Sequence, residues 1–226
     1  MVETRDTYVV IAAFNEAAVI RSVVREVVAQ GYPVVVVDDG SHDDTAAAAA
    51  MPGATVLRHV VNLGQGAALQ TGIDYALRRT ARYIVTFDAD GQHSVEDLAA
   101  LVAALATHDV VLGSRFLGKA VVGASRRRKM LLRGATMMSN RMTGMKLTDA
   151  HCGLRAFRAS AAPALYLVQD RMAHASELLN KIRASGLRVV EVPVTIKYTE
   201  HSTRKGQSAF QAVRIMFDYF FRARHR

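Results

Sequence analysis

Short apolar runs alternate with helix-like segments along the first half of the chain, and this alternation constrains the fold more than any other feature. The runs are rich in valine and isoleucine and occupy residues 8–13, 33–38, 54–58 and 83–88. Strands that are apolar along their whole length are buried on both faces, which is typical of parallel sheets built from strand–helix–strand units. The sequence therefore predicts an α/β fold with a mostly parallel central sheet flanked by helices.

The other predicted elements follow from periodicity and capping residues. Helices are predicted at 16–30, from about Ser41 or Asp43, and at 65–79, 125–142 and 206–222, with a further strand at 191–198. No repeat, linker or shift of composition divides the 226 residues, so we expect a single domain. The composition, 50% hydrophobic and 22% charged, excludes general disorder.

Cysteine content and the first residues indicate where the protein works. A single cysteine, Cys152, excludes a disulfide framework and fits a reducing compartment. The chain starts with polar residues, so no signal peptide is expected, and no apolar run approaches the ~18–20 residues that span a bilayer. We therefore expect a cytoplasmic protein, soluble or peripheral at the inner face of the membrane.

The net charge of +9 is concentrated in one segment. There is no acidic residue between Val110 and Thr148, and without the basic residues of this segment the chain would hold 20 basic and 20 acidic residues. These basic residues are Arg115, Lys119, Arg126, Arg127, Arg128, Lys129, Arg133, Arg141 and Lys146. Such an excess indicates a polyanionic partner, either phosphate groups, an anionic membrane surface or nucleic acid; a solvated surface loop is the alternative.

The predicted helix at 206–222 has one narrow polar stripe and is apolar elsewhere. An apolar surface this wide has to be covered. An anionic membrane surface, a separate membrane protein, a second copy of the chain or the domain itself could cover it.

Paired acidic residues follow two of the predicted strands. Asp88 and Asp90 end the strand at 83–88, and Asp38 and Asp39 end the strand at 33–38. Ligands of such sheets bind beyond the carboxyl ends of the strands, so we expect both pairs at one rim. Mg²⁺ is typically held by one or two carboxylates, with substrate phosphates as further ligands. The alternative is that these aspartates only form turns or cap helices.

Together the motifs resemble the family-2 glycosyltransferases of the nucleotide-diphospho-sugar transferase fold, GT-A, and within them the dolichol- or polyprenyl-phosphate mannosyltransferase branch. The matching segments are 11–16, 37–41, 62–68, 87–93, 113–116, 148–155 and 204–208. Two of them depart from the family pattern, since alanine replaces a common proline in the first and Gln65 replaces the usual lysine in the third. Members often carry C-terminal transmembrane helices, and none is predicted here.

The resemblance implies a donor, a metal and a division of the chain. Residues 1–113 would bind a nucleotide-diphospho-sugar and the metal, and residues 114–226 the acceptor. Asp88, Asp90 and Gln92 would hold Mg²⁺ or Mn²⁺. The implied donor contacts are Ala12, Phe14, Glu16, Asp38, Asp39, Gln65, Ala89 and Lys205.

The implied reaction is inverting, metal-dependent transfer of a hexose to a polyprenyl phosphate. The metal on Asp88 and Asp90, together with the cation of Arg204, would neutralise the departing diphosphate. Arg115 and Arg128 are the implied ligands of the acceptor phosphate. Arg126 or Arg127 could take the place of Arg128.

Two other functions stay open. With a glycan or small-molecule hydroxyl as acceptor, the reaction would need a general base, for which Asp149 is the first candidate and Glu177 the second. A phosphate acceptor is already anionic and needs none. A basic nucleic-acid-binding module is a remote alternative; because the basic segment lacks aromatic stacking residues, we expect no nucleic acid partner.

Overall fold

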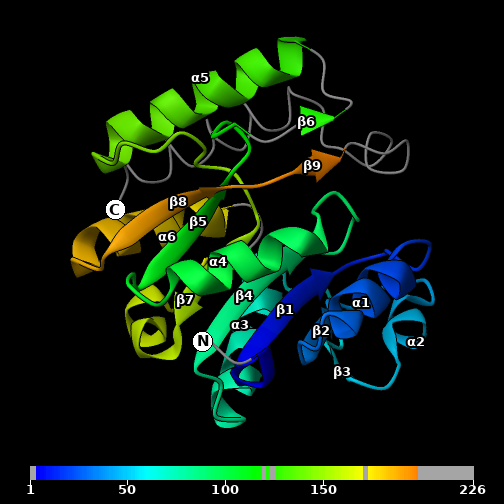
Figure 1. The fold of residues 1–226 in the computed structure, drawn as a ribbon. Helices are drawn as coiled ribbons and strands as arrows, with labels where there is room; N and C mark the ends of the chain where they lie inside the picture. Colours follow the sequence, from blue (N-terminus) through cyan, green and yellow to red (C-terminus); the bar gives the residue numbers. More distant parts are fainter. Residues whose placement is uncertain (1–3, 119–120, 123–125, 170–172, 198–226) are drawn as a thin grey trace.

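The computed structural model describes residues 4–118, 121–122, 126–169 and 173–197. Arg204, Lys205 and the predicted helix at 206–222 lie outside these residues. The predicted α/β fold is confirmed, because a seven-stranded sheet in the order β3-β2-β1-β4-β7-β5-β8 forms the centre of the molecule (Figure 1). The strands are β1 (Thr7–Ala13), β2 (Val34–Asp38), β3 (Ala54–Arg58), β4 (Tyr83–Asp88), β5 (Val110–Ser114), β7 (Arg155–Arg158) and β8 (Val189–Pro193).

The sheet is parallel except at β7, which is antiparallel to its neighbours β4 and β5. The register places Ala12 beside Asp88 and Ala13 beside Asp38, so the ends of β1, β2 and β4 are level. Because β7 runs the other way, the residues that precede it lie at this same rim. The antiparallel strand therefore brings residues 148–154 to the carboxyl ends of β4 and β5.

Helices cover both faces of the sheet, and each face has its own buried apolar cluster. Val9 and Ile11 of β1 face the cluster with α1, α2 and α4, and Val10 between them faces the cluster with α3, α6 and the 3₁₀ helix η3. This two-sided burial explains the continuous valine runs. The elements are α1 (Ile20–Ala29), α2 (Thr45–Ala49), α3 (Gln65–Arg78), α4 (Leu98–Ala104), α6 (Ala173–Ser185), η1 (Thr4–Asp6), η2 (Val95–Asp97) and η3 (Ala159–Leu165).

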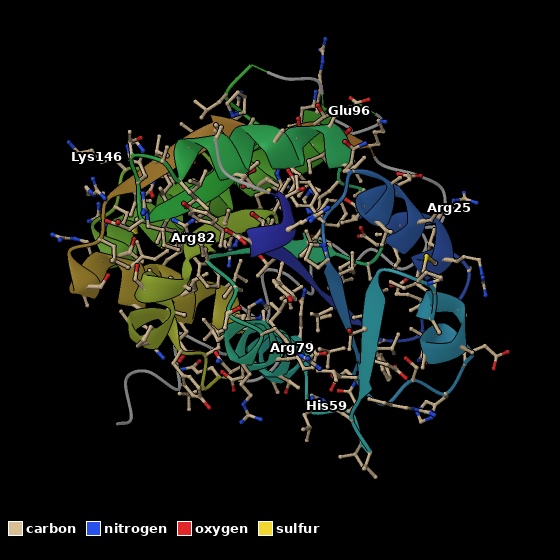
Figure 2. All side chains as sticks on the ribbon, turned by 60° about the horizontal axis from the view of Figure 1, so that its bottom comes forward. Arg25, His59, Arg79, Arg82, Glu96 and Lys146 are labelled. Carbon is tan, nitrogen blue, oxygen red and sulfur yellow. The ribbon has the colours of Figure 1, made fainter. Side chains whose placement is uncertain are left out.

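The remaining elements lie at the edge of this body. α5 (Arg126–Thr143) runs along one side of the molecule, apart from α1 and α2 (Figure 1), and contacts α6. β6 (Val121–Val122) and β9 (Ile196–Lys197) form a separate two-stranded sheet. Charged side chains such as those of Arg25 and Lys146 project outward (Figure 2). Within the part of the chain that the structure describes, no helix has the length and apolarity needed to cross a bilayer.

The first predicted helix begins later than expected, at Ile20 rather than Glu16. The backbone N–H groups of Asn15 and Glu16 donate to the hydroxyl oxygens of Ser41 and Thr45, at 2.8 and 2.7 Å. Contacts with the next loop therefore replace the first helical turn. The second helix, predicted from about Ser41 or Asp43, begins at Thr45. The hydroxyl of Thr45 itself makes one of the two contacts with the first loop.

The predicted strand at 191–198 is divided in two. β8 begins earlier, at Val189, and pairs with β5 up to Pro193. The chain then leaves that ladder, because the N–H of Thr195 donates to the buried carboxylate of Asp97 at 2.6 Å. After this contact the chain pairs with β6 instead.

Candidate active site

The rim at the carboxyl ends of β4 and β5 collects the predicted acidic and basic residues. A methyl group at Gly153 would lie 2.2 Å from Oδ2 of Asp88, so the segment before β7 is in contact with the end of β4. Cys152, next to it, is buried. Burial raises the pKa of this thiol to about 12, and the charges of Asp149, Arg115 and Asp88 all act on it. Gly153 contacts Asp88, and Asp149 lies in the same segment before β7 as Gly153.

Asp88 and Asp90 are close enough to repel each other. Burial and the charge of Asp88 raise the pKa of Asp90 above its ordinary value. The carboxylate of Asp90 accepts hydrogen bonds from the backbone N–H of Gln92 at 3.0 Å and from its amide nitrogen at 2.6 Å. Two adjacent carboxylates with a neighbouring amide are oxygen donors suited to a divalent cation whose other ligands come from phosphates. The residues present fit Mg²⁺ or Mn²⁺.

In the described part of the chain, no group of three or more His, Cys, Asp or Glu side chains forms a complete metal cage.

Asp88 has a partner that the sequence did not assign to it. The Nε2 atom of His93 lies 2.8 Å from Oδ2 of Asp88. Burial alone would raise the pKa of Asp88, but this contact and the positive charge of Arg155 hold that pKa below its ordinary value. Asp88 is therefore ionised in the free protein.

Asp38 and Asp39 hold loops at the carboxyl end of β2. Asp38 is fully buried; it accepts from the N–H of Ser41 at 3.0 Å and pairs with Arg58 at 3.2 Å. Asp39 accepts from the N–H groups of Leu63 and Gly64, at 2.9 and 2.7 Å.

Asp39 also lies 2.8 Å from a ring nitrogen of His59. Gly64 has φ of +98°, a conformation that favours glycine, and it turns the chain into α3. Asp39 thus ties β2 to the glycine-containing loop, whatever contact it makes with a donor.

The other predicted donor residues flank this loop. Ala12 and Ala89 lie at the ends of β1 and β4, and Gln65 is the first residue of α3. Phe14 is exposed, with its ring 6.0 Å from that of His42 in an edge-on arrangement. The structure brings these residues to one rim, while Lys205 lies outside the described residues.

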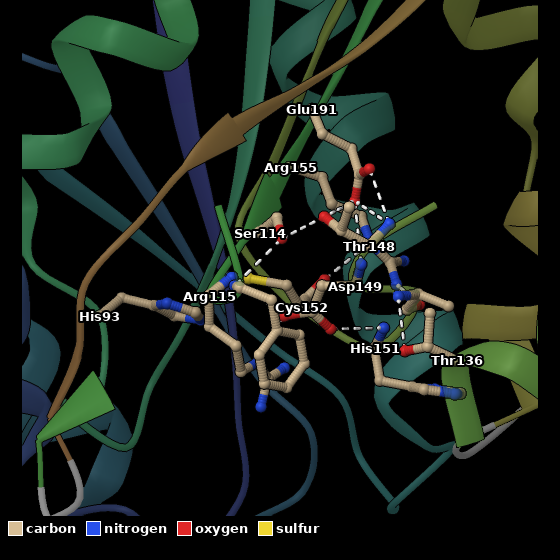
Figure 3. Close-up of polar contacts among 12 residues, drawn as sticks. His93, Ser114, Arg115, Thr136, Thr148, Asp149, His151, Cys152, Arg155 and Glu191 are labelled. Carbon is tan, nitrogen blue, oxygen red and sulfur yellow. Dashed lines mark hydrogen bonds and ion pairs between the residues drawn. The ribbon is translucent and has the colours of Figure 1, made fainter. Parts of the chain in front are cut away.

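Arg115 and Asp149 form a buried ion pair, shown in Figure 3. The N–H and the Nε of Arg115 both donate to Oδ2 of Asp149, at 3.1 and 2.5 Å. The N–H of His151 donates to Oδ1 at 3.2 Å. Asp149 thus already accepts three hydrogen bonds, which is a poor arrangement for a general base.

A second group of contacts fixes the segment that carries Asp149. Glu191 of β8 accepts from the N–H of Thr148 at 2.8 Å and from the N–H of Asp149 at 2.9 Å (Figure 3). The hydroxyl of Thr148 lies 2.6 Å from that of Ser114. Glu191 is not among the predicted site residues. Its position beside Thr148 depends on the pairing of β8 with β5, which the sequence pattern does not show.

Arg155 was also missed, although it lies in one of the quoted motifs. Its side chain is buried, and Nε donates to the carbonyl oxygen of Cys152 at 2.9 Å. Burial lowers the pKa of Arg155, while Asp88 and Asp149 act in the opposite direction. The positive charge of Arg155 in turn lowers the pKa of Asp88.

Glu177 makes its contacts at another place, at the start of α6. Glu177 binds the N–H groups of Val168 and Gln169 and pairs with Lys181. Burial opposes ionisation of Glu177, but these bonds keep its pKa below the ordinary value. Glu177 therefore stabilises the turn that precedes α6. Arg128 lies in α5, and Arg204 is outside the described residues.

Comparison with known proteins decides the family. The sequence model described as Glycosyl transferase family 2 matches residues 8–165. The chain belongs to this family. It is a glycosyltransferase, and the resemblance drawn from the motifs is confirmed.

Two relatives of this glycosyltransferase cover nearly all of it. The UDP-N-acetylglucosamine–dolichyl-phosphate N-acetylglucosaminyltransferase of Methanococcus voltae is 31% identical, over 95% of this chain and 93% of that protein. The polyprenol monophosphomannose synthase of Mycolicibacterium smegmatis is 33% identical, over 89% of this chain and 81% of that protein.

A solved structure supports the GT-A fold. Glucosyl-3-phosphoglycerate synthase from Mycobacterium tuberculosis, in complex with Mn²⁺, UDP-glucose and phosphoglyceric acid, has a TM-score of 0.66 to this chain. The two are 21% identical, and the match covers 92% of this chain and 77% of the other. At this identity the likeness establishes the fold alone.

Proposed function

We propose that this family-2 glycosyltransferase transfers a hexose from a nucleotide-diphospho-sugar to a polyprenyl phosphate, with Mg²⁺ or Mn²⁺ and with inversion at the sugar carbon. The observation that carries the proposal is the meeting of two paired carboxylates and a buried arginine–aspartate ion pair at one rim. The Asp88–Asp90 pair follows β4, and the Arg115–Asp149 ion pair involves the segment before β7, whose Gly153 is in contact with Asp88. An acidic site for a metal-bound diphosphate beside an arginine suits the joining of two phosphorylated substrates.

Asp88, Asp90 and Gln92 would hold the metal, which supplies positive charge to a diphosphate leaving group. Arg204, if it reaches the rim, adds a fixed cation there. The loops held by Asp38 and Asp39 place Phe14, Gln65 and their neighbours around the nucleoside. In this proposal residues 1–113 bind the donor and the metal, and residues 114–226 bind the acceptor.

The state of Asp149 favours a phosphate acceptor over a hydroxyl. A hydroxyl acceptor needs a base, but the carboxylate of Asp149 is engaged by Arg115 and by the N–H of His151. A phosphate monoester is already anionic near neutral pH, so it can attack without a base. Arg115, held by Asp149, would then bind that phosphate, with Arg128 as the second candidate. Both relatives named above are polyprenyl-phosphate enzymes by their names.

The acceptor is tested by supplying the purified enzyme and Mn²⁺ with UDP- or GDP-hexoses and either undecaprenyl phosphate or undecaprenol. We expect a glycolipid only with the phosphate. Its glycosyl phosphate bond should be cleaved by mild acid, which leaves ordinary glycosides intact. Transfer to undecaprenol, or to a soluble sugar hydroxyl, would favour the alternative acceptor class.

We further propose that α5 contacts an anionic membrane surface, with the enzyme peripheral at the inner, cytoplasmic face. Arg126 and Arg127 are exposed on α5, as are Met130 and Met137, at 72% and 71%. Exposed methionines between arginines suit the boundary between headgroups and acyl chains. Each basic residue near an anionic bilayer contributes about 1 kcal/mol.

Vesicle flotation tests this surface. Binding to vesicles rich in phosphatidylglycerol is expected to fall with rising salt, because the attraction is screened. The variant Arg126/Arg127/Arg128→Ala should bind at least about tenfold more weakly, since three contributions of about 1 kcal/mol are lost.

A matched variant controls for net charge. Arg25/Arg79/Arg82→Ala removes the same charge from α1, from the residue after α3 and from the residue before β4 (Figure 2), and should float like the wild type. If the wild type ignores anionic vesicles even at low salt, the membrane surface is wrong and a soluble acceptor gains support.

A further inference from the structure

His93 is fixed in place more firmly than a residue in a loop would normally be. It is buried, and its ring meets that of Phe87 edge-on, with 5.4 Å between the centroids. Its backbone forms a bridge to Ile196, and the carbonyl of neighbouring Gln92 accepts from the N–H of Lys197 at 2.8 Å. The ring therefore has little freedom to turn away from Asp88.

The contact between His93 and Asp88 has a defined direction. A carboxylate oxygen accepts hydrogen bonds, so in this contact Nε2–H of His93 is the donor and Oδ2 of Asp88 is the acceptor, at 2.8 Å. Among the residues that the structure describes, the other ring nitrogen, Nδ1, is buried and has no hydrogen-bond partner. The hydrogen bond from Nε2 to Oδ2 of Asp88 is thus the polar contact that fixes the imidazole relative to this carboxylate.

Gly153 confines the same carboxylate from another side. A methyl group there would lie 2.2 Å from Oδ2 and 2.4 Å from Oδ1 of Asp88, so the carboxylate fills the space that a side chain would take. His93 and Gly153 together restrict the orientation of the Asp88 carboxylate at the end of β4. Groups that hydrogen-bond to a metal ligand commonly set its orientation.

We propose that His93 is a positioning residue that orients the carboxylate of Asp88 for the divalent metal. The inference rests on the proposed function, because it takes Asp88 and Asp90 as metal ligands. His93 itself touches neither metal nor substrate in this proposal. It acts through Asp88. Its backbone also links the loop that follows β4 to β9. β9 in turn pairs with β6, the short strand that precedes α5.

Two substitutions separate positioning from packing. His93→Phe keeps a ring against Phe87 but removes the donor, whereas the amide nitrogen of His93→Gln occupies about the place of Nε2 and keeps it. Mn²⁺ affinity is measured by electron paramagnetic resonance, with UDP or GDP present and without any acceptor. We expect His93→Phe to bind Mn²⁺ about 10- to 100-fold more weakly and His93→Gln to recover most of the affinity.

Controls use the same measurement. His108→Phe changes a histidine at the opposite end of β5 and should bind Mn²⁺ like the wild type. Thermal unfolding shows whether each variant is folded. If His93→Phe does not fold, His93→Asn replaces it, since its shorter amide does not reach Asp88.

The outcomes are distinct. Wild-type affinity in His93→Phe, or equal loss in His93→Phe and His93→Gln, overturns the positioning role. If the Asp90→Ala variant binds Mn²⁺ as tightly as the wild type does, the metal site of the proposed function is itself wrong. This inference then falls with it. Loss in His93→Phe with recovery in His93→Gln supports it.

Discussion

Gly153→Ala should lower kcat/KM by at least about 100-fold while the protein stays folded. The added methyl group would lie 2.2 Å from an oxygen of Asp88 and 2.6 Å from its Cγ, distances at which the carboxylate has to move. The backbone of Gly153 is not left-handed, so alanine is strained by this contact alone. A shift of about 1 Å in a catalytic group costs on the order of 100-fold.

A double-mutant comparison shows whether the loss acts through Asp88. Steady-state rates are measured for Gly153→Ala, Asp88→Asn and the double variant. If both changes disable the same carboxylate, the double variant should be no slower than Asp88→Asn alone. Additive losses, or a Gly153→Ala enzyme as active as the wild type, would mean that the contact does not govern the site.

Asp90→Ala should reduce transfer on the order of 1000-fold, because a bound cation is worth several kcal/mol of transition-state stabilisation. The fold should be unaffected or slightly stabilised. Asp90 is half-buried at the rim, and burial and repulsion from Asp88 already oppose its charge. Transfer rates across a Mn²⁺ titration, together with thermal unfolding, measure both effects.

Metal removal and a neighbouring acid provide the controls. EDTA should abolish wild-type transfer but leave the residual activity of Asp90→Ala unchanged. Glu96→Ala removes an exposed acid from the same loop region (Figure 2) and should retain wild-type rates. Full activity of Asp90→Ala, or a wild type indifferent to EDTA, would remove the metal from the proposed function.

The predicted strands agree with the structure to within one residue at β1 through β4. Their valine runs need burial on both faces, and only the centre of a covered sheet provides it. The start of the first helix at Glu16 is predicted too early, because the loop at 15–16 binds the loop that follows β2. Local propensity contains no information about hydrogen bonds between segments that are distant in the sequence.

The candidate site divides in the same way. Asp88, Asp90, Asp38 and Asp39 could be placed at one rim from the sequence, since parallel strands end together. The pairing of Arg115 with Asp149 could not be predicted from the sequence. In the sequence Asp149 is a candidate general base for a hydroxyl acceptor, and in the structure it is the partner of an arginine.

The amino-acid sequence alone established the first four strands, the family motifs and the acidic residues at the strand ends, because each depends on neighbours along the chain, whereas β5 and β7 were not predicted. Only the tertiary structure decided what those acids touch. The antiparallel insertion of β7 between β4 and β5 brings Gly153 against Asp88, and Glu191 of β8 secures Thr148 and Asp149. Such contacts join residues far apart in the chain, and their geometry exists only once the sheet has formed.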